Sequence, residues 1–321
     1  MKLDPKARAL LTAIAVAGEP AIDTVPLEYA REQVEKGYGR MNIPVKQVGA
    51  ITNRTVQGSG GEIPIRIYTP FGKGPFPVVV YFHGGGWVFF HLDAYDPTCT
   101  HLCLSSESII VSVDYRLSPE FKFPAAIDDC FESAKWANLH CMEWNGIPGS
   151  LVLAGDSAGG NLATVVSMKF LAEGSSLVKG QVLIYPVTDH YLPEKPSYIE
   201  FADGYGLTKD AMKWFWGKYL AKEEDALNPL AAPLKSSNLQ GLPPAYILVA
   251  GYDPLRDDGL QYAEKLKEFG VNVTLSVYED MIHGFLSYLG ILRQATKAID
   301  EIGGWIGAQS NTRTIEQRSL N

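Results

Sequence analysis

The sequence is poor in cysteine, and the four that occur follow no metal-binding or disulfide-rich pattern. They are Cys99, Cys103, Cys130 and Cys141 in a chain of 321 residues. No C-x-x-C pair is present and no histidine pair lies nearby at zinc-finger spacing, which argues against a zinc site. We therefore expect free thiols in a reducing compartment, and a cytoplasmic protein.

Long apolar runs and basic clusters are also missing. No apolar run approaches the roughly 18 residues that a bilayer-spanning helix needs. The 28 lysines and arginines are outnumbered by 36 aspartates and glutamates, which gives a net charge of −8. Such a chain repels the phosphate backbone of a nucleic acid. We expect neither a membrane nor a nucleic acid as a partner.

The remaining composition is that of an ordinary globular protein. Hydrophobic residues make up 46% and charged residues 20% of the chain, which argues against a disordered or fibrous protein. The N-terminus has basic residues before an apolar stretch at 9–17, as in a signal peptide. Asp4 interrupts the basic region, and Pro5 after it is typical of a helix start. We predict a retained amphipathic helix over residues 4–17.

Short apolar strands alternate with helices along most of the chain. Strands are predicted at 63–68, 78–82, 108–114, 150–155, 181–185, 245–250 and 273–278, and helices at 26–37, 124–139, 161–173, 258–270 and 290–306. This alternation predicts an α/β fold, with a mostly parallel sheet covered by helices on both faces.

The alternation stops between Pro186 and Leu242, which predicts an insertion above the sheet. A helix is predicted there over residues 207–220, with Thr208 as its cap. Its apolar stripe consists of Met212, Phe215, Trp216 and Tyr219. These side chains either pack against the domain below or line a pocket, and the sequence leaves both alternatives open.

The pentapeptide Gly-Asp-Ser-Ala-Gly at residues 155–159 matches the G-x-S-x-G pattern of a nucleophile elbow. Its context makes the match informative, because it follows the predicted strand 150–155 and opens the helix 161–173. A strand–turn–helix raises the serine hydroxyl above the edge of the sheet. The helix N-terminus favours the negative charge that develops during acyl transfer. We predict that Ser157 is a nucleophile.

A second glycine-rich loop, His-Gly-Gly-Gly-Trp at residues 83–87, follows the strand 78–82. Three glycines leave backbone N–H groups uncovered and free to point at one oxygen. The loop lacks the spacing of a phosphate-binding loop but fits half of an oxyanion hole, with the Ala158 N–H as the other half. We expect His83 to brace this loop rather than act as a base.

The order of the remaining residues indicates the catalytic base. In a hydrolase with a strand–elbow–helix, the acid and then the histidine follow the serine in loops after later strands. Only His190 and His283 follow Ser157. His190 lies at the entry of the insertion, whereas His283 follows the predicted strand 273–278. The order therefore favours His283 as the base.

The acid is expected in the loop after the strand 245–250. That loop offers three carboxylates, Asp253, Asp257 and Asp258. Asp253 is nearest the end of the strand and precedes a proline that fixes the loop, whereas the other two are typical of the first turn of a helix. We predict that Asp253 is the acid.

These motifs resemble the hormone-sensitive-lipase-like family of α/β-hydrolases. The resemblance rests on residues 83–87, 114–120 with 123–126, 155–161, 253–257 and 283–285, and it covers nearly the whole chain. It implies an α/β-hydrolase fold with a helical cap. The cap would consist of residues 1–45 and 188–239, the catalytic domain of 46–187 and 240–310, and the flexible tail of 311–321.

The resemblance also implies a serine carboxylesterase that works through an acyl-enzyme on a small-molecule ester, with no cofactor and no metal. It implies that the backbone N–H groups of Gly85, Gly86 and Ala158 hold the oxyanion, although the residues alone leave Gly84 as an alternative. The family often pairs through an edge strand, here 273–278, so a homodimer is expected.

The chain departs from the family pattern after Trp87. Phe89, Phe90 and His91 stand where the family usually has a small turn that contains glycine. We expect these bulky rings to narrow the pocket, with a preference for acyl chains of roughly two to eight carbons. The alternatives are amidase, carbamate-hydrolase or deacetylase activity with the same triad, or a non-catalytic receptor of this fold. Such receptors have lost the catalytic histidine, so His283 argues against that alternative.

Overall fold

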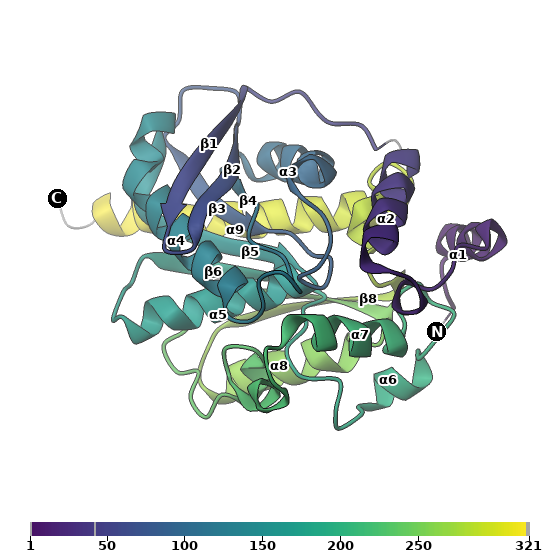
Figure 1. The fold of residues 1–321 in the computed structure, drawn as a ribbon. Coiled ribbons are helices and arrows are strands. Elements are labelled where there is room, and N and C mark those ends of the chain that lie inside the picture. The colour runs from purple at the N-terminus through teal and green to yellow at the C-terminus, as the bar shows by residue number, and fades with distance from the viewer. Residues whose placement is uncertain (1, 42, 319–321) are drawn as a thin grey trace.

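The computed structural model describes residues 2–41 and 43–318 and contains an eight-stranded sheet between helical layers (Figure 1). The strands are β1 (Ala50–Gly58), β2 (Gly61–Thr69), β3 (Phe76–Phe82), β4 (Ile109–Val113), β5 (Gly146–Asp156), β6 (Val178–Ile184), β7 (Ala245–Tyr252) and β8 (Val273–Ile282). Their order in the sheet is β1-β2-β4-β3-β5-β6-β7-β8. Only the β1–β2 and β2–β4 pairs are antiparallel, which confirms the mostly parallel α/β sheet.

Helices cover both faces of this sheet. In chain order, the described helices are α1 (Pro5–Ala17), α2 (Leu27–Met41), α3 (Leu92–Ser106), α4 (Ala125–His140), α5 (Ala158–Ala172), α6 (Pro196–Glu200), α7 (Lys209–Tyr219), α8 (Arg256–Glu268) and α9 (Arg293–Arg318). Buried residues of β3 alternate between two hydrophobic clusters, because successive side chains of a strand point to opposite faces. Val78 and Val80 pack with α4, α5 and α8, whereas Val79 and Tyr81 pack with α3 and α9. No described helix has the length and apolarity that would let it span a membrane.

Helix α1 forms at the position that the sequence predicts, and it is attached to the rest of the fold at its N-terminal end. Asp4 caps it, since its carboxylate accepts hydrogen bonds from the backbone N–H groups of Lys6 and Ala7. Leu3 and Ala7 are buried in the same cluster as α9, and the Asp4 N–H donates to the Asp280 carbonyl. The start of helix α1 is therefore anchored to strand β8, which contains Asp280.

The segments assigned to a cap lie on one side of the molecule. Helices α1, α2, α6 and α7 gather at the right in Figure 1. Helix α7 contacts the short helical turn η1 (Ile22–Thr24), which connects α1 to α2. The insertion and the N-terminal helices thus meet in space although they are far apart in the sequence.

Two segments differ from the sequence-based expectations. Helix α3 was not predicted, and α9 continues to Arg318 into the segment 311–321, which was expected to be a flexible tail. No proline interrupts residues 307–318, so the closing helix has no strong stop signal there. Residues 319–321 lie outside the described part of the chain. The four cysteines are free and buried, Cys99 and Cys103 within α3.

Candidate active site

Ser157 lies at the junction between β5 and α5 in a strained backbone conformation. Its φ of 55° and ψ of −117° are rarely adopted by residues other than glycine. The flanking glycines allow the tight turn, because a Cβ on Gly159 would lie 1.9 Å from the Phe82 carbonyl oxygen. A Cβ on Gly155 would lie 2.3 Å from the Gly159 carbonyl oxygen. The backbone is therefore packed too closely here for any side chain, as a nucleophile elbow requires.

The structure brings Ser157, His283 and Asp253 together in one hydrogen-bonded chain. His283 Nε2 lies 3.0 Å from Ser157 Oγ, and His283 Nδ1 lies 2.7 Å from Asp253 Oδ2. The Asp253 carboxylate accepts a hydrogen bond from the Nδ1–H group, which leaves Nε2 unprotonated and able to take the proton of the serine hydroxyl. Asp253 is fully buried, and its other oxygen accepts a hydrogen bond of 2.8 Å from the Leu255 N–H. The carboxylate is thereby fixed from both sides.

The glycine-rich loop presents two uncommitted donors beside the serine. Gly84 is not one of them, since its N–H donates to Tyr95 Oη at 2.9 Å and to Asp156 Oδ1 at 3.1 Å. The N–H groups of Gly85 and Gly86 have no hydrogen-bond acceptor within residues 2–41 and 43–318, and nor does that of Ala158 at the start of α5. These three donors are the ones that the family resemblance implies for an oxyanion hole.

Asp156 joins the loop to the elbow, a role that the sequence analysis missed. Its buried carboxylate accepts hydrogen bonds from the hydroxyls of Tyr81 and Tyr95, each at 2.9 Å, and from the Gly84 N–H. Burial raises the pKa of the carboxyl group, and the two hydroxyls oppose that rise. A carboxylate at the end of a buried apolar strand is the only signal for this role in the sequence.

His83 braces the glycine loop from within the core. Its imidazole is fully buried and stacks on the Tyr115 ring, with centroids 4.2 Å apart and an interplanar angle of 14°. Burial lowers the pKa of His83 to about 4, so the ring is neutral. Its Nδ1–H donates to the Gly84 carbonyl at 2.8 Å. This geometry agrees with the expectation that His83 is structural.

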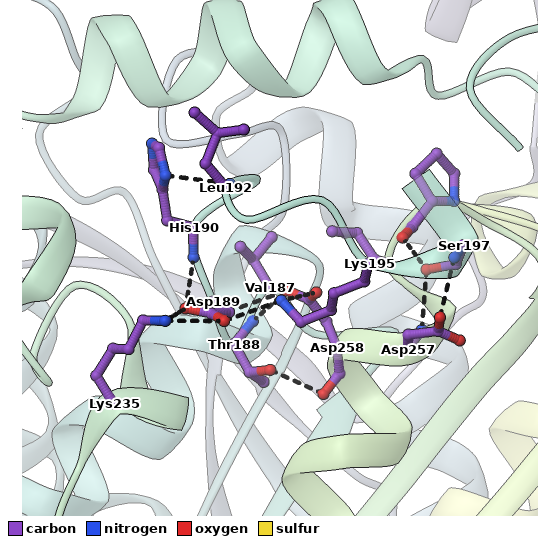
Figure 2. A network of polar contacts seen from close by, with 12 residues as sticks. Val187, Thr188, Asp189, His190, Leu192, Lys195, Ser197, Lys235, Asp257 and Asp258 are labelled. Carbon is purple, nitrogen blue, oxygen red and sulfur yellow. Dashed lines mark hydrogen bonds and ion pairs between the residues drawn. The ribbon is translucent and has the colours of Figure 1, made fainter. Parts of the chain in front are cut away.

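The other candidate residues, Asp257, Asp258 and His190, have polar partners in or beside the insertion, as Figure 2 shows. Asp257 accepts a hydrogen bond of 2.9 Å from the Ser197 N–H. Asp258 lies 3.0 Å from Lys195 Nζ, and burial raises the pKa of its carboxyl group to about 6 although the lysine opposes the rise. His190 Nδ1 accepts a hydrogen bond from a nearby backbone N–H within the insertion. All three residues therefore have structural partners.

The aromatic stripe of the insertion packs onto the glycine loop. Its members Met212, Phe215, Trp216 and Tyr219 are all buried. Trp87 stacks on Tyr219 with centroids 4.0 Å apart. A Cβ on Gly86 would lie 2.1 Å from the Phe215 ring, so this ring lies directly against the Cα of Gly86. The stripe both packs against the domain below and forms part of the site.

The chain is similar to known ester hydrolases over most of its length. Residues 79–287 match a protein family described as having the alpha/beta hydrolase fold. The carboxylic ester hydrolase LipN of Mycobacterium tuberculosis is 40% identical over 243 residues, which are 74% of this chain and 64% of LipN. An ethyl acetate hydrolase of Pseudomonas putida is 32% identical over 310 residues, 93% of this chain and 96% of that protein.

A solved structure agrees with these relatives. The hyperthermophilic esterase of the archaeon Pyrobaculum calidifontis superposes with a TM-score of 0.93 at 38% sequence identity, over 97% of this chain and 99% of that one. Sequence identity this high over nearly the whole of both chains indicates membership of the same family, and not only the same fold.

Proposed function

Because the chain belongs to the hormone-sensitive-lipase-like family of α/β-hydrolases and is a carboxylic ester hydrolase, we propose that Ser157 is its nucleophile. Asp253 and His283 complete the catalytic triad. The observation that carries this proposal is the unbroken hydrogen-bonded chain from Ser157 Oγ through the imidazole to the Asp253 carboxylate. Small carboxylic esters are the substrates.

The reaction proceeds in two acyl transfers. Ser157 Oγ attacks the ester carbonyl carbon while His283 Nε2 takes the hydroxyl proton, and the same proton then passes to the departing alkoxide. The resulting acyl-enzyme is attacked by water, which His283 activates in the same way, and the acid leaves as Ser157 regains its proton. Asp253 holds the required tautomer and stabilises the imidazolium that forms in each step.

The N–H groups of Gly85, Gly86 and Ala158 hold the tetrahedral oxyanion. They support this role because their hydrogen atoms are uncommitted, because Ala158 directly follows Ser157, and because the neighbouring Gly84 is hydrogen-bonded to Asp156, the residue before Ser157. Donors that are already oriented need no reorganisation as the negative charge develops. Removing one such donor typically costs about 10²–10³ in kcat.

Short- to medium-chain acyl groups are the preferred substrates. The Phe215 ring covers Gly86, and Phe89 and Phe90 lie against Gly85, so little space is left beside the oxyanion donors. The similar Pseudomonas protein is named for ethyl acetate, a short ester. We expect kcat/KM on p-nitrophenyl esters to be highest between acetate and octanoate. A maximum at laurate or a longer ester would contradict this preference.

The Ser157→Ala variant tests the nucleophile directly. With p-nitrophenyl acetate, kcat should fall by about 10³-fold or more, because an essential member of the triad is lost. Ser167→Ala is the matched control, since this serine lies within α5, the helix that Ser157 precedes, and its hydroxyl donates to the Ala163 carbonyl. Retention of more than about a tenth of the activity by Ser157→Ala would show that another residue is the nucleophile. Turnover by the natural sequence also excludes a non-catalytic receptor.

The homodimer and the cytoplasmic location also belong to this proposal. Strand β8 is the last strand in the sheet order, and Val277 on it is 42% exposed, which supports pairing with a second copy through this edge. Buried free thiols support a reducing compartment. Light scattering should give twice the chain mass for the natural sequence and the single mass for Val277→Lys. A monomer in both would contradict the dimer.

A further inference from the structure

Phe90 has an unusual backbone conformation beside the oxyanion donors. Its φ is 75°, in the left-handed region where a bulky side chain is rare. The family pattern has a glycine-containing turn here, whereas this chain has an aromatic residue. A strained residue persists only where its surroundings hold it in place. The contacts of the Phe90 side chain therefore indicate what this conformation does.

The Phe90 ring lies directly against the oxyanion loop. A Cβ on Gly85 would lie 2.7 Å from this ring. The ring is half-buried and also lines a cavity of about 360 Å³ between the loop and helix α2. Removing the ring would therefore open space beside Gly85 and also widen this cavity, which other residues line.

Tyr38 of helix α2 continues this wall to the histidine loop. Its ring lies against Phe90, with centroids 4.6 Å apart. Its hydroxyl is hydrogen-bonded to Ser287 Oγ, and Ser287 follows His283 by four residues in the short helix η5 (Phe285–Tyr288). Burial and the negative charge of Asp156 raise the pKa of Tyr38, so the hydroxyl stays protonated and able to bond.

Aromatic rings thus lie against both glycines that offer free N–H groups. Phe90 and Tyr38 reach from Gly85 to the segment that follows His283, and the Phe215 ring lies against Gly86. Ser157 is only 8% exposed. The alcohol leaves after the first step, whereas the acyl group stays bound to Ser157 until water releases it. A fixed wall therefore acts on the acyl group throughout both steps.

We propose that Phe90 and Tyr38 form a wall that sets the longest acyl chain the enzyme accepts. This inference rests on the proposed ester hydrolysis at Ser157. It makes Phe90 and Tyr38 specificity-determining residues, with no part in proton transfer or oxyanion binding. Phe90 supplies the bulk, and the Tyr38–Ser287 hydrogen bond fixes the position of the second ring.

The Phe90→Gly variant tests the wall, because glycine adopts a φ of 75° without strain. We expect its kcat/KM ratio of p-nitrophenyl decanoate to acetate to rise by about tenfold or more, since poorly fitting methylenes are then accommodated. Tyr38→Ala should shift the ratio in the same direction, and Tyr38→Phe less. Glu107→Gly is the matched control, because Glu107 also has a left-handed φ, of 49°, but is exposed at the end of α3.

Two outcomes would contradict the proposal that Phe90 and Tyr38 limit the length of the acyl chain. One is a ratio for Phe90→Gly within about twofold of that of the natural sequence. The other is a gain only for acetates of longer alcohols, which would place the wall on the alcohol side.

A binding measurement tests the role of Phe90 and Tyr38 independently of the proposed ester hydrolysis. Failure of the natural sequence to hydrolyse any ester would contradict ester hydrolysis. Calorimetry with decanoate, the acyl product, on the Ser157→Ala background needs no turnover. Tighter binding after Phe90→Gly supports the wall, and unchanged binding contradicts it.

Discussion

Asp253 and Asp257 lie four residues apart but have different partners. Asp253 faces His283 at 2.7 Å, whereas Asp257 accepts hydrogen bonds from the Ser197 backbone and the Arg256 side chain. Only the first carboxylate selects a tautomer of the imidazole.

Asp253→Asn should therefore lower kcat by about 10⁴-fold, because an amide in this position leaves the histidine in the wrong tautomer. Asp257→Asn, the matched control, should change kcat by no more than about threefold, since it touches no reacting group. Steady-state hydrolysis of p-nitrophenyl acetate by both variants measures the difference. Losses of similar size would contradict Asp253 as the acid.

His83 makes the stability of the fold depend on pH. Its pKa is lowered from 6.5 to about 4 in the folded protein, whereas in the unfolded chain it titrates near its ordinary value. The unfolded state therefore binds an extra proton between these two pH values. The stabilising contribution of the neutral ring is complete above pH 6.5 and is lost as the pH falls towards 4.

We expect the free energy of unfolding to fall by about 2–3 kcal/mol through His83 alone between pH 7 and pH 4.5. Urea unfolding of the natural sequence and of His83→Gln at both pH values isolates this contribution, because the other titrating groups are shared. The free energy of unfolding should decrease less between the two pH values for His83→Gln than for the natural sequence. Equal decreases would mean that His83 is not the titrating group.

The sequence predicted three residues that the structure brings into hydrogen-bonding distance, but not all of the contacts that support them. Chain order and strand ends were enough to select Ser157, Asp253 and His283 for one site. The exclusion of Gly84 and the role of Asp156 depend on how the ends of β3 and β5 meet, since Gly84 donates across that junction. Spacing along the chain contains no information about such a contact.

At the scale of elements, one arginine of helix α2 attaches it to the chain after the glycine-rich loop and to the segment 118–120. The Arg31 guanidinium forms two hydrogen bonds with the Glu120 carboxylate, at 2.7 and 2.8 Å. It also donates to the carbonyls of Val88 at 3.1 Å and Ser118 at 3.0 Å. A planar fork that is bonded on several sides gives a more specific attachment than a single ion pair.

Arg31→Ala should loosen α2 without unfolding the domain. Amide hydrogen exchange within α2 should become faster, corresponding to a loss of about 1–3 kcal/mol in local opening free energy. Arg40→Ala is the matched control, because Arg40 lies on the same helix, is largely exposed and reaches Glu19 only at 3.8 Å. Equal exchange in the two variants would argue against Arg31 as the anchor.

The elements themselves were predictable to different degrees. Helix α7 begins where its cap predicted, since Thr208 Oγ1 accepts a hydrogen bond from the Ala211 N–H. Helix α3 was missed because it has buried residues on most sides and a proline at position 97. It therefore presents no single apolar stripe of helical period.

At the scale of the whole molecule, a buried ionic network joins the insertion to the catalytic domain (Figure 2). Lys195 Nζ lies 3.0 Å from both the Asp189 and the Asp258 carboxylates, and all three side chains are buried. Lys235, near the end of the insertion, reaches Asp189 at 3.1 Å. The start of the insertion is thus fixed to helix α8 through Asp258, and Lys235 ties the end of the insertion back to its start.

Lys195→Met should destabilise the protein by about 3–5 kcal/mol at pH 8, because two carboxylates are left without their buried countercharge. The pKa of Asp258, already raised to about 6, rises further without the lysine. Protonation then favours the folded state, so the loss should shrink as the pH falls from 8 to 5. Urea unfolding at both values tests this, with the more exposed Lys209→Met as control. A loss that does not depend on pH would contradict the ionic role.

The main-chain contact between Gly159 and the Phe82 carbonyl has a consequence for redesigning the enzyme. Any side chain at position 159 would push the end of β3 away and displace Ser157 with it. Mutant libraries that randomise residues 155 or 159 should yield almost no active clones. Phe90 and Phe215 contribute only side chains to the cleft, so libraries there should keep the reaction while changing its substrates. The reaction therefore depends on a backbone arrangement that tolerates no change, whereas the choice of substrate depends on side chains that can be replaced.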